Sequence, residues 1–171
     1  MKIRNGFVSN SSSSSFIVIF PTEPKSVDDV KNFLFDKEDE MYCKDYTVDQ
    51  VAKTVWGDIC DQKKNDYNII LKEFESGHLN IDGAPEYSDF SHITDFSQKF
   101  KAYKKANRKF ANKVMNKFFN LRKLKLKEIT KENIEESAYV FGYADEDGSY
   151  GSALEHGDLF SKLKHIRISK H

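Results

Sequence analysis

The chain has 171 residues with 27 basic and 27 acidic side chains, so its formal net charge is zero. We expect a single domain over residues 1–171, long enough to bury roughly 70% of the surface of its unfolded chain. Cys43 and Cys60 form no CxxC or Cys/His ligand pattern, which argues against a disulfide scaffold and favours a reducing, cytoplasmic compartment. The longest apolar run, Phe16–Phe20, is too short to span a membrane, and no secretion signal precedes it.

The charges are segregated along the chain. Residues 1–95 contain 18 acids and 10 bases, a difference of −8, whereas residues 96–171 contain 9 acids and 17 bases, a difference of +8. Within the second part, residues 96–127 contain twelve bases and no acid. Two interpretations stay open, because this basic segment could fold against the acidic half of the chain or attract an anionic partner.

The N-terminal segment predicts two strands around a serine tract. Residues Ile3–Val8 form a short apolar run, and Ser11–Ser15 then lead into the β-branched and aromatic run Phe16–Phe20. A continuous apolar run of this kind is typical of a strand buried on both faces, in the middle of a sheet. For the serines we prefer a hydroxyl-lined loop or β-bulge over an anion-binding loop, because the glycines and lysine of a P-loop are missing.

Three helices are expected next. Ser26 precedes acids that suit a first helical turn, and Thr47 with Gln50 has the spacing of a capping box. A third helical pattern covers Tyr67–Ser76, and residues 78–94 have the composition of a long ordered loop.

The strongest helical periodicity runs from Phe96 to Leu121 and predicts one long amphipathic helix. Its aromatic and aliphatic residues fall on one stripe, which we expect to be buried, and its lysines and arginines fall on the flank and far side. After this helix, Leu124–Lys127 alternates like a short strand or a frayed helix end, and Thr130 is the expected cap of a further short helix.

The C-terminal quarter has a β-rich pattern. It predicts a strand over Ala138–Tyr143, a turn over Asp145–Gly148 and a second hairpin arm over Tyr150–Ala153. A short helix over Glu155–Leu163 and a last strand over His165–Ile168 follow. The order of elements indicates an α+β fold in which the N- and C-terminal strands form a small sheet and several helices, one of them long and amphipathic, pack on it.

Pairing of the two chain ends would also bring together polar side chains. A serine could act as nucleophile, a histidine as base, a carboxylate as orienting group and an arginine as oxyanion or phosphate partner. The candidate residues are Ser12, Ser13, Glu155, His156 and Arg167. No GxSxG elbow supports such a triad, so a partly buried structural histidine is the more ordinary interpretation. No HxH or HExxH spacing occurs, and we expect neither a metal site nor a cofactor.

The basic helix offers a different candidate, a surface for polyanions. Its cations could attract nucleic-acid phosphates or an acidic protein, while a buried aromatic stripe would leave no ring for reading bases. The candidate binding residues are Lys101, Lys104, Lys105, Arg108 and Lys109.

Two short motifs carry a family resemblance. The stretch Arg4–Phe16, RNGFVSNSSSSSF, and the C-terminal Glu155-His-Gly157 followed by His165–Ser169 resemble a group of small uncharacterised proteins of tailed bacteriophages and bacterial mobile elements. The resemblance covers about the first twenty and last thirty residues. It implies a phage-type accessory product in the cytoplasm of a bacterial host, and it implies no catalytic residue.

Two hypotheses follow. The first is a non-enzymatic protein that binds a host or phage macromolecule, either nucleic acid or protein, through the basic helix and without contact to a membrane. The second is a small hydrolase or transferase that uses the serine tract with His156 and Arg167. Convergence of these groups on an open pocket would favour the enzyme, and their burial beside an exposed basic face would favour the binder.

Overall fold

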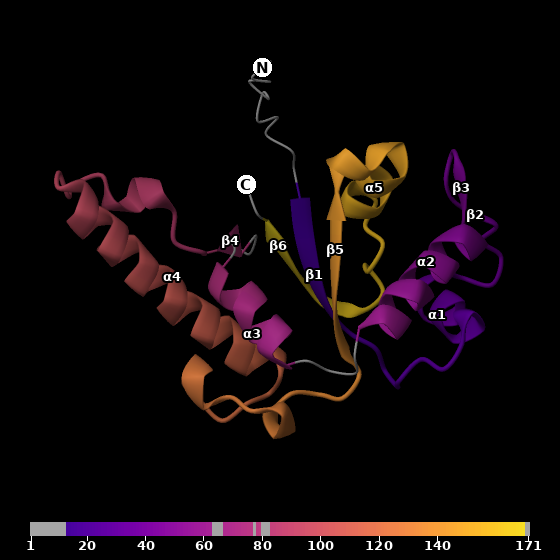
Figure 1. Cartoon of the computed structure of the whole chain (residues 1–171), viewed down its shortest axis with the longest axis horizontal. Helices are drawn as coiled ribbons and strands as arrows, with labels where there is room; N and C mark the ends of the chain where they lie inside the picture. The colour runs from indigo at the N-terminus through magenta and orange to yellow at the C-terminus, as the bar shows by residue number, and fades with distance from the viewer. Residues whose placement is uncertain (1–12, 63–66, 77, 80–82, 170–171) are drawn as a thin grey trace, which may run out of the picture.

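The computed structural model describes residues 13–62, 67–76, 78–79 and 83–169. An antiparallel sheet with strand order β4-β6-β1-β5 lies between two groups of helices (Figure 1). The strands are β1 (Ser13–Ile19), β4 (His78–Leu79), β5 (Ala138–Ala144) and β6 (Lys164–Ser169). The predicted α+β class, with a sheet built from both ends of the chain, is therefore confirmed.

Strand β1 is the centre of this sheet. It pairs with β5 on one side and with β6 on the other, as its apolar sequence predicts. Phe16 and Val18 face one hydrophobic cluster, whereas Ile17 and Ile19 face a second cluster on the opposite side. All four side chains are buried, so alternate residues of one strand supply the cores of both layers.

The serine tract differs from the prediction of a loop or bulge. Ser13, Ser14 and Ser15 belong to β1 and pair in regular register with Ala144, Tyr143 and Gly142 of β5. The neighbouring strands supply the backbone hydrogen bonds that a serine run would otherwise seek from water, and this tertiary pairing outweighs the turn preference of serine. The strand predicted over residues 3–8 lies outside the described residues.

Helices cover both faces of the sheet. Their bounds are α1 (Val27–Leu34), α2 (Val48–Asp61), α3 (Tyr67–Ser76), α4 (Phe96–Phe118) and α5 (Gly148–His156). Helices α1 and α2 contribute to the Phe16 side of the core, and α3 and α4 contribute to the Ile17 side. The predicted caps are confirmed, because Ser26 accepts from the Asp29 amide and Thr47 forms a capping box with Gln50. A small hairpin, β2 (Met41–Cys43) and β3 (Tyr46–Thr47), precedes α2.

The aromatic stripe of α4 is buried along part of the helix. Met115 and Phe118 are buried in the core, and Phe110 is half-buried. The prediction of a fully buried stripe is wrong at the N-terminal end, where Phe96 is 74% and Phe100 is 42% exposed. Figure 1 shows the reason: this end of α4 extends past the sheet, so none of the described strands covers it.

The segments flanking α4 contain short 3₁₀ helices. Within the predicted loop 78–94, η1 (Tyr87–Phe90) packs its rings against Tyr103 of α4. After α4 the chain forms η2 (Leu126–Glu128) and η3 (Lys131–Asn133), so Leu124–Lys127 forms no strand. Thr130 is the N-cap residue of η3, as predicted. Within the described ranges, no helix is both long enough and apolar enough to cross a membrane.

Two predictions for the C-terminal quarter are wrong. The segment Tyr150–Ala153, expected to be a hairpin arm, belongs to helix α5, which follows the 3₁₀ helix η4 (Asp145–Asp147). The segment Glu155–Leu163, expected to be a helix of its own, is helical only at Glu155 and His156, where α5 ends. The two glycines of α5 disfavour a helix in isolation, but Gly151 permits close packing. A Cβ atom there would lie 2.3 Å from the Ala144 carbonyl oxygen. Tertiary contact with the end of β5 therefore decides the local structure.

Candidate functional site

Polar side chains from three elements meet at the end of the sheet where β1 begins and where β5 and β6 end. Ser14 of β1 lies opposite Tyr143 and Ser169, and Phe16 lies opposite Arg167. Because side chains alternate along a strand, Ser14, Phe16 and Arg167 share the face on which α5 packs. Arg167 also lies over the Phe16 ring, 5.7 Å from its centroid.

Glu155 is the centre of this group. The Ser14 hydroxyl donates to Glu155 Oε1 at 2.8 Å, and Arg167 Nε donates to Ser14 Oγ at 3.0 Å. Arg167 Nη2 lies 3.4 Å from the same Glu155 oxygen. The Glu155 side chain has no exposed surface, whereas that of Arg167 is 29% exposed. The sheet thus holds a buried carboxylate against a cation, which is the condition under which such burial is tolerated.

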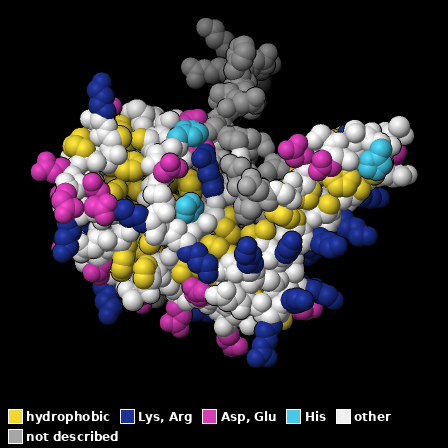
Figure 2. Space-filling model, turned by 180° about the vertical axis from the view of Figure 1, so that it is seen from behind, with side chains coloured by type: hydrophobic (Ala, Val, Ile, Leu, Met, Phe, Trp, Pro, Cys, Tyr) yellow, Lys and Arg dark blue, Asp and Glu magenta, His cyan; other side chains and the backbone are white. Residues whose placement is uncertain are grey.

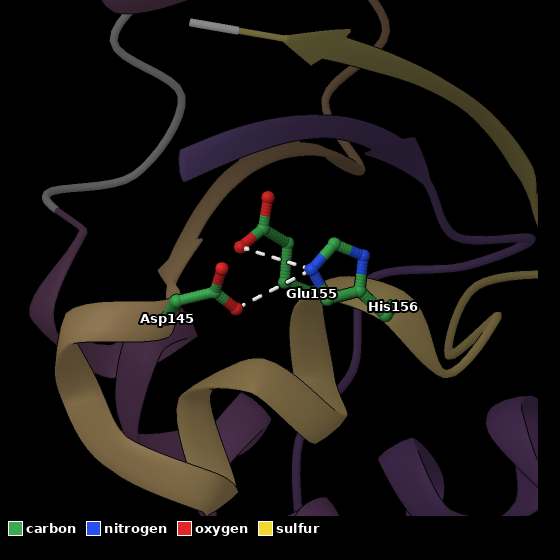
Figure 3. A group of neighbouring side chains, drawn as sticks. All are labelled: Asp145, Glu155 and His156. Carbon is green, nitrogen blue, oxygen red and sulfur yellow. Dashed lines mark ion pairs between the residues drawn. The ribbon is translucent and has the colours of Figure 1, made fainter. Parts of the chain in front are cut away.

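The second oxygen of Glu155 faces His156 and Asp145. His156 Nε2 is 3.7 Å from Glu155 Oε2 and 3.3 Å from Asp145 Oδ1, so both carboxylates approach one ring nitrogen (Figure 3). The side chains of His156 and Asp145 are 51% and 41% exposed. We call Ser14, Asp145, Glu155, His156 and Arg167 the Glu155 cluster.

The structure brings together three of the residues that the sequence singled out. Glu155, His156 and Arg167 all belong to the Glu155 cluster, whereas Ser13 is half-buried at the start of β1 and Ser12 lies outside the described residues. The serine that contacts them is Ser14.

Asp145 was missed as a site residue. The sequence placed it in a turn, and its position depends on the packing of α5 against the end of β5, for which no sequence motif exists.

The order of these groups differs from that of a nucleophilic triad. In a triad the histidine contacts the nucleophile and the carboxylate orients the histidine. Here the Glu155 carboxylate lies between Ser14 and His156, and Ser14 is 1% exposed with its hydroxyl engaged by both Glu155 and Arg167. Within the described residues, this geometry does not support Ser14 as a nucleophile.

A second, partly buried polar contact joins β5 to α2, next to Ser14 of the cluster. The Tyr143 hydroxyl donates to Asp58 Oδ2 at 3.0 Å. Burial is the main cause that raises the pKa of Tyr143 well above its ordinary value, and the Asp58 carboxylate adds to the rise. Burial also raises the pKa of Asp58, against the opposing effect of the Tyr143 hydrogen bond. This pair has the features of a structural contact, because Tyr143 is also part of the aromatic core.

The other candidate site is the basic side of α4. We define the basic face as Lys101, Lys104, Lys105, Arg108 and Lys109, all of which are exposed. At 100° per residue these five positions fall within an arc of about 140°. Figure 2 shows Lys and Arg side chains in a row beside an apolar strip along this part of the molecule.

Few acids neutralise the basic face. In the part of the chain that the structure describes, Arg108 pairs with Glu75 at 3.1 Å, and the four lysines of the face form no ion pair. The expectation that the acidic half of the chain folds against the basic segment is therefore met, within the described residues, by the single ion pair between Arg108 and Glu75. Long exposed cations without acidic partners are available to an external anion.

Two features adjoin the basic face. At the N-terminal end of α4, the exposed rings of Phe96 and Phe100 are parallel to within 3°, with Lys104 Nζ 4.7 Å from the Phe100 centroid. Towards its C-terminal end, a surface hollow of about 530 Å³ lies between α4 and the following loop. The loop is held there because Asn116 donates to the Leu124 carbonyl and accepts from the Leu124 amide. The residues that line the hollow include Lys109, Lys113 and Lys123.

Comparison with known proteins gives no further assignment. No protein-family model matches the chain, and no curated protein or solved structure is similar to it.

Proposed function

We propose that this chain is a phage-type accessory protein that binds nucleic-acid phosphates through the basic face of α4, without catalysis, in the cytoplasm of a bacterial host. One observation carries the proposal: five exposed cations share one side of a helix, and Arg108 alone among them has an acidic partner in the described residues. Displacement of counterions by such a row of cations gives affinity for a phosphate backbone. The partly buried Glu155 cluster offers no comparable open surface of one charge.

The exposed rings favour a single strand over a duplex. Phe96 and Phe100 are exposed at the edge of the basic face, where unpaired bases could stack on them while the lysines contact the backbone. Base stacking on aromatic rings contributes roughly 1–3 kcal/mol per base and tolerates any base. The proposed ligand is therefore single-stranded nucleic acid, bound with little dependence on sequence.

The test is binding of fluorescently labelled oligonucleotides, measured by anisotropy over a series of salt concentrations. We expect a single-stranded DNA to bind more tightly than a duplex of equal length, with affinity that falls steeply with salt. The variant Lys101→Ala/Lys105→Ala should weaken binding at least about tenfold. The matched control is Lys37→Ala/Lys44→Ala, which removes the same charge from two exposed lysines outside the basic face.

Three outcomes would contradict the proposal. If both double variants weaken binding equally, the affinity reflects overall charge and not the basic face. If no oligonucleotide binds at low salt, while an acidic polypeptide such as poly-glutamate does, the basic face binds acidic protein instead. A tenfold preference between unrelated oligonucleotides of equal length would contradict the expected indifference to sequence.

A further inference from the structure

The Glu155 cluster contains three side chains of the kinds that bind metal ions. Asp145, Glu155 and His156 each present one ligand atom, and these atoms lie within 4.8 Å of one another. They come from two adjoining elements, η4 and the last turn of α5. Sequence spacing does not reveal them as a set, because Asp145 and Glu155 are ten positions apart and only the packing of α5 closes the distance.

The distances in this group differ from those of hydrogen bonds. His156 Nε2 lies 3.3 Å from Asp145 Oδ1 and 3.7 Å from Glu155 Oε2, both beyond the usual range of an N–H···O bond. In addition, a single Nε2–H cannot point at two carboxylates. The separations fit another arrangement. Ligand atoms bound to Zn²⁺ at about 2.0–2.2 Å in tetrahedral geometry lie about 3.3–3.6 Å from one another. The two His156 distances, 3.3 and 3.7 Å, lie at or close to this range, and the third separation is within 4.8 Å.

The surroundings orient the buried ligand. Ser14 donates to Glu155 Oε1 at 2.8 Å, and Arg167 approaches the same oxygen at 3.4 Å. Oε2 is thereby directed towards Asp145 and His156 (Figure 3). A hydrogen bond such as that from Ser14 to a ligating carboxylate is part of the usual outer shell of a metal site, where it fixes the ligand and tunes its basicity.

We propose that Asp145 Oδ1, Glu155 Oε2 and His156 Nε2 bind a divalent transition-metal ion. The mixed set of one imidazole and two carboxylates suits Zn²⁺, Mn²⁺ or Co²⁺, and suits Mg²⁺ poorly because that ion prefers oxygen ligands in octahedral geometry. His156 and Asp145 are partly exposed, so solvent reaches the ion and can complete its coordination. Three protein ligands with a solvent position characterise exchangeable or catalytic sites, and four ligands characterise structural ones.

The experiment is a calorimetric titration of the chelator-treated full chain with Zn²⁺ at pH 7.5, with Mg²⁺ in a parallel run. We expect one Zn²⁺ per chain and much weaker Mg²⁺ binding. His156→Ala and Asp145→Asn should each lower the Zn²⁺ affinity at least about 100-fold, and Ser14→Ala roughly 10- to 100-fold through the outer shell. Because His156 and Asp145 are partly exposed, both ligand variants should fold.

Matched controls separate this site from other zinc ligands. Asp147→Asn changes an exposed acid of the same 3₁₀ helix, and His92→Ala changes an exposed histidine near α4. Cys43→Ser/Cys60→Ser removes both thiols, the strongest competing ligands for zinc. All three controls should bind Zn²⁺ like the parent chain.

Three results would overturn the proposal. Zinc affinity that is equal in the parent, His156→Ala and Asp145→Asn would place binding elsewhere, and so would loss of binding in the cysteine variant. As a second readout, Co²⁺ bound to the parent should give the visible absorption of a low-symmetry nitrogen and oxygen site. If that absorption persists in His156→Ala, this histidine is not a ligand. None of these results depends on the basic face of α4.

Discussion

The Glu155 cluster and the basic face hold charged side chains in opposite ways. The cluster combines residues from β1, β6 and the η4–α5 segment, and its central carboxylate is entirely buried. The basic face lies on one helix, its side chains are exposed, and one of them has an acidic partner in the described residues. Burial therefore decides the role of a charge: buried charges stabilise or destabilise the fold, whereas exposed charges remain available to a partner.

Removal of the Glu155 carboxylate should have a large effect on stability. Glu155→Ala leaves Ser14 and Arg167 without their buried partner and opens a cavity, and we expect a loss of about 3 kcal/mol in the free energy of unfolding. The measurement is urea denaturation. The control Glu38→Ala removes an exposed acid and should change stability by less than about 0.5 kcal/mol. A loss below about 1 kcal/mol for Glu155→Ala would mean that the cluster is dispensable to the fold.

The same contrast exists inside α4, between its two ends. Met115 is completely buried, so Met115→Ala should cost about 2–5 kcal/mol, within the range of large core truncations. Phe100 is 42% exposed, and Phe100→Ala should cost far less while it weakens single-strand binding by about 1–3 kcal/mol. Denaturation and anisotropy on both variants separate the two roles. Equal destabilisation would show that the Phe100 ring belongs to the core.

Charge removal on the basic face should change binding and leave stability alone. Lys101→Ala/Lys105→Ala should shift the free energy of unfolding by less than about 0.5 kcal/mol. The log–log salt slope of DNA binding should become shallower by about 0.7 per lost phosphate contact on a single strand, or about 0.9 on a duplex. A change in stability without a change in the slope would mean that the acidic half of the chain neutralises these lysines.

Local signals in the sequence predicted much of the fold. The apolar run Phe16–Phe20 predicted the buried central strand, and the caps Ser26 and Thr47 predicted where two helices begin. These signals succeed because burial of both strand faces and satisfaction of helix amides are requirements of the segment itself. The periodicity of α4 likewise identified the helix.

The failures share a physical cause, namely contacts that no local pattern encodes. Periodicity places Phe96 and Phe100 on the apolar side of α4 but does not say whether another element covers that side. The helix α5 and the position of Asp145 depend on the close approach of Gly151 to Ala144. Pairing of the terminal strands was predictable from the sequence, and it placed Glu155, His156 and Arg167 near one another. The set of possible metal ligands was not predictable, because it also requires Asp145.

The smallest expected effect concerns Asp58, a partly buried carboxylate that, unlike Glu155, accepts a hydrogen bond from a neutral tyrosine. Burial raises its pKa in the folded chain above the ordinary value of 3.8, so the folded state binds a proton on Asp58 more tightly than the unfolded state does. This contribution to stability is fully present below the unfolded pKa and is lost as pH rises through the raised folded pKa. Above this raised pKa the ionised group therefore opposes folding.

Asp58→Asn should remove this penalty, because the asparagine carbonyl can still accept from Tyr143 and carries no charge. We expect a small gain in stability at pH 7 that disappears as pH falls through the pKa of Asp58. Urea denaturation of parent and variant at a series of pH values measures the difference, with Asp45→Asn as the control for loss of an exposed acid that does not act on the pKa of Asp58. A variant less stable than the parent at pH 7 would show that the carboxylate's bond to Tyr143 outweighs the cost of its burial.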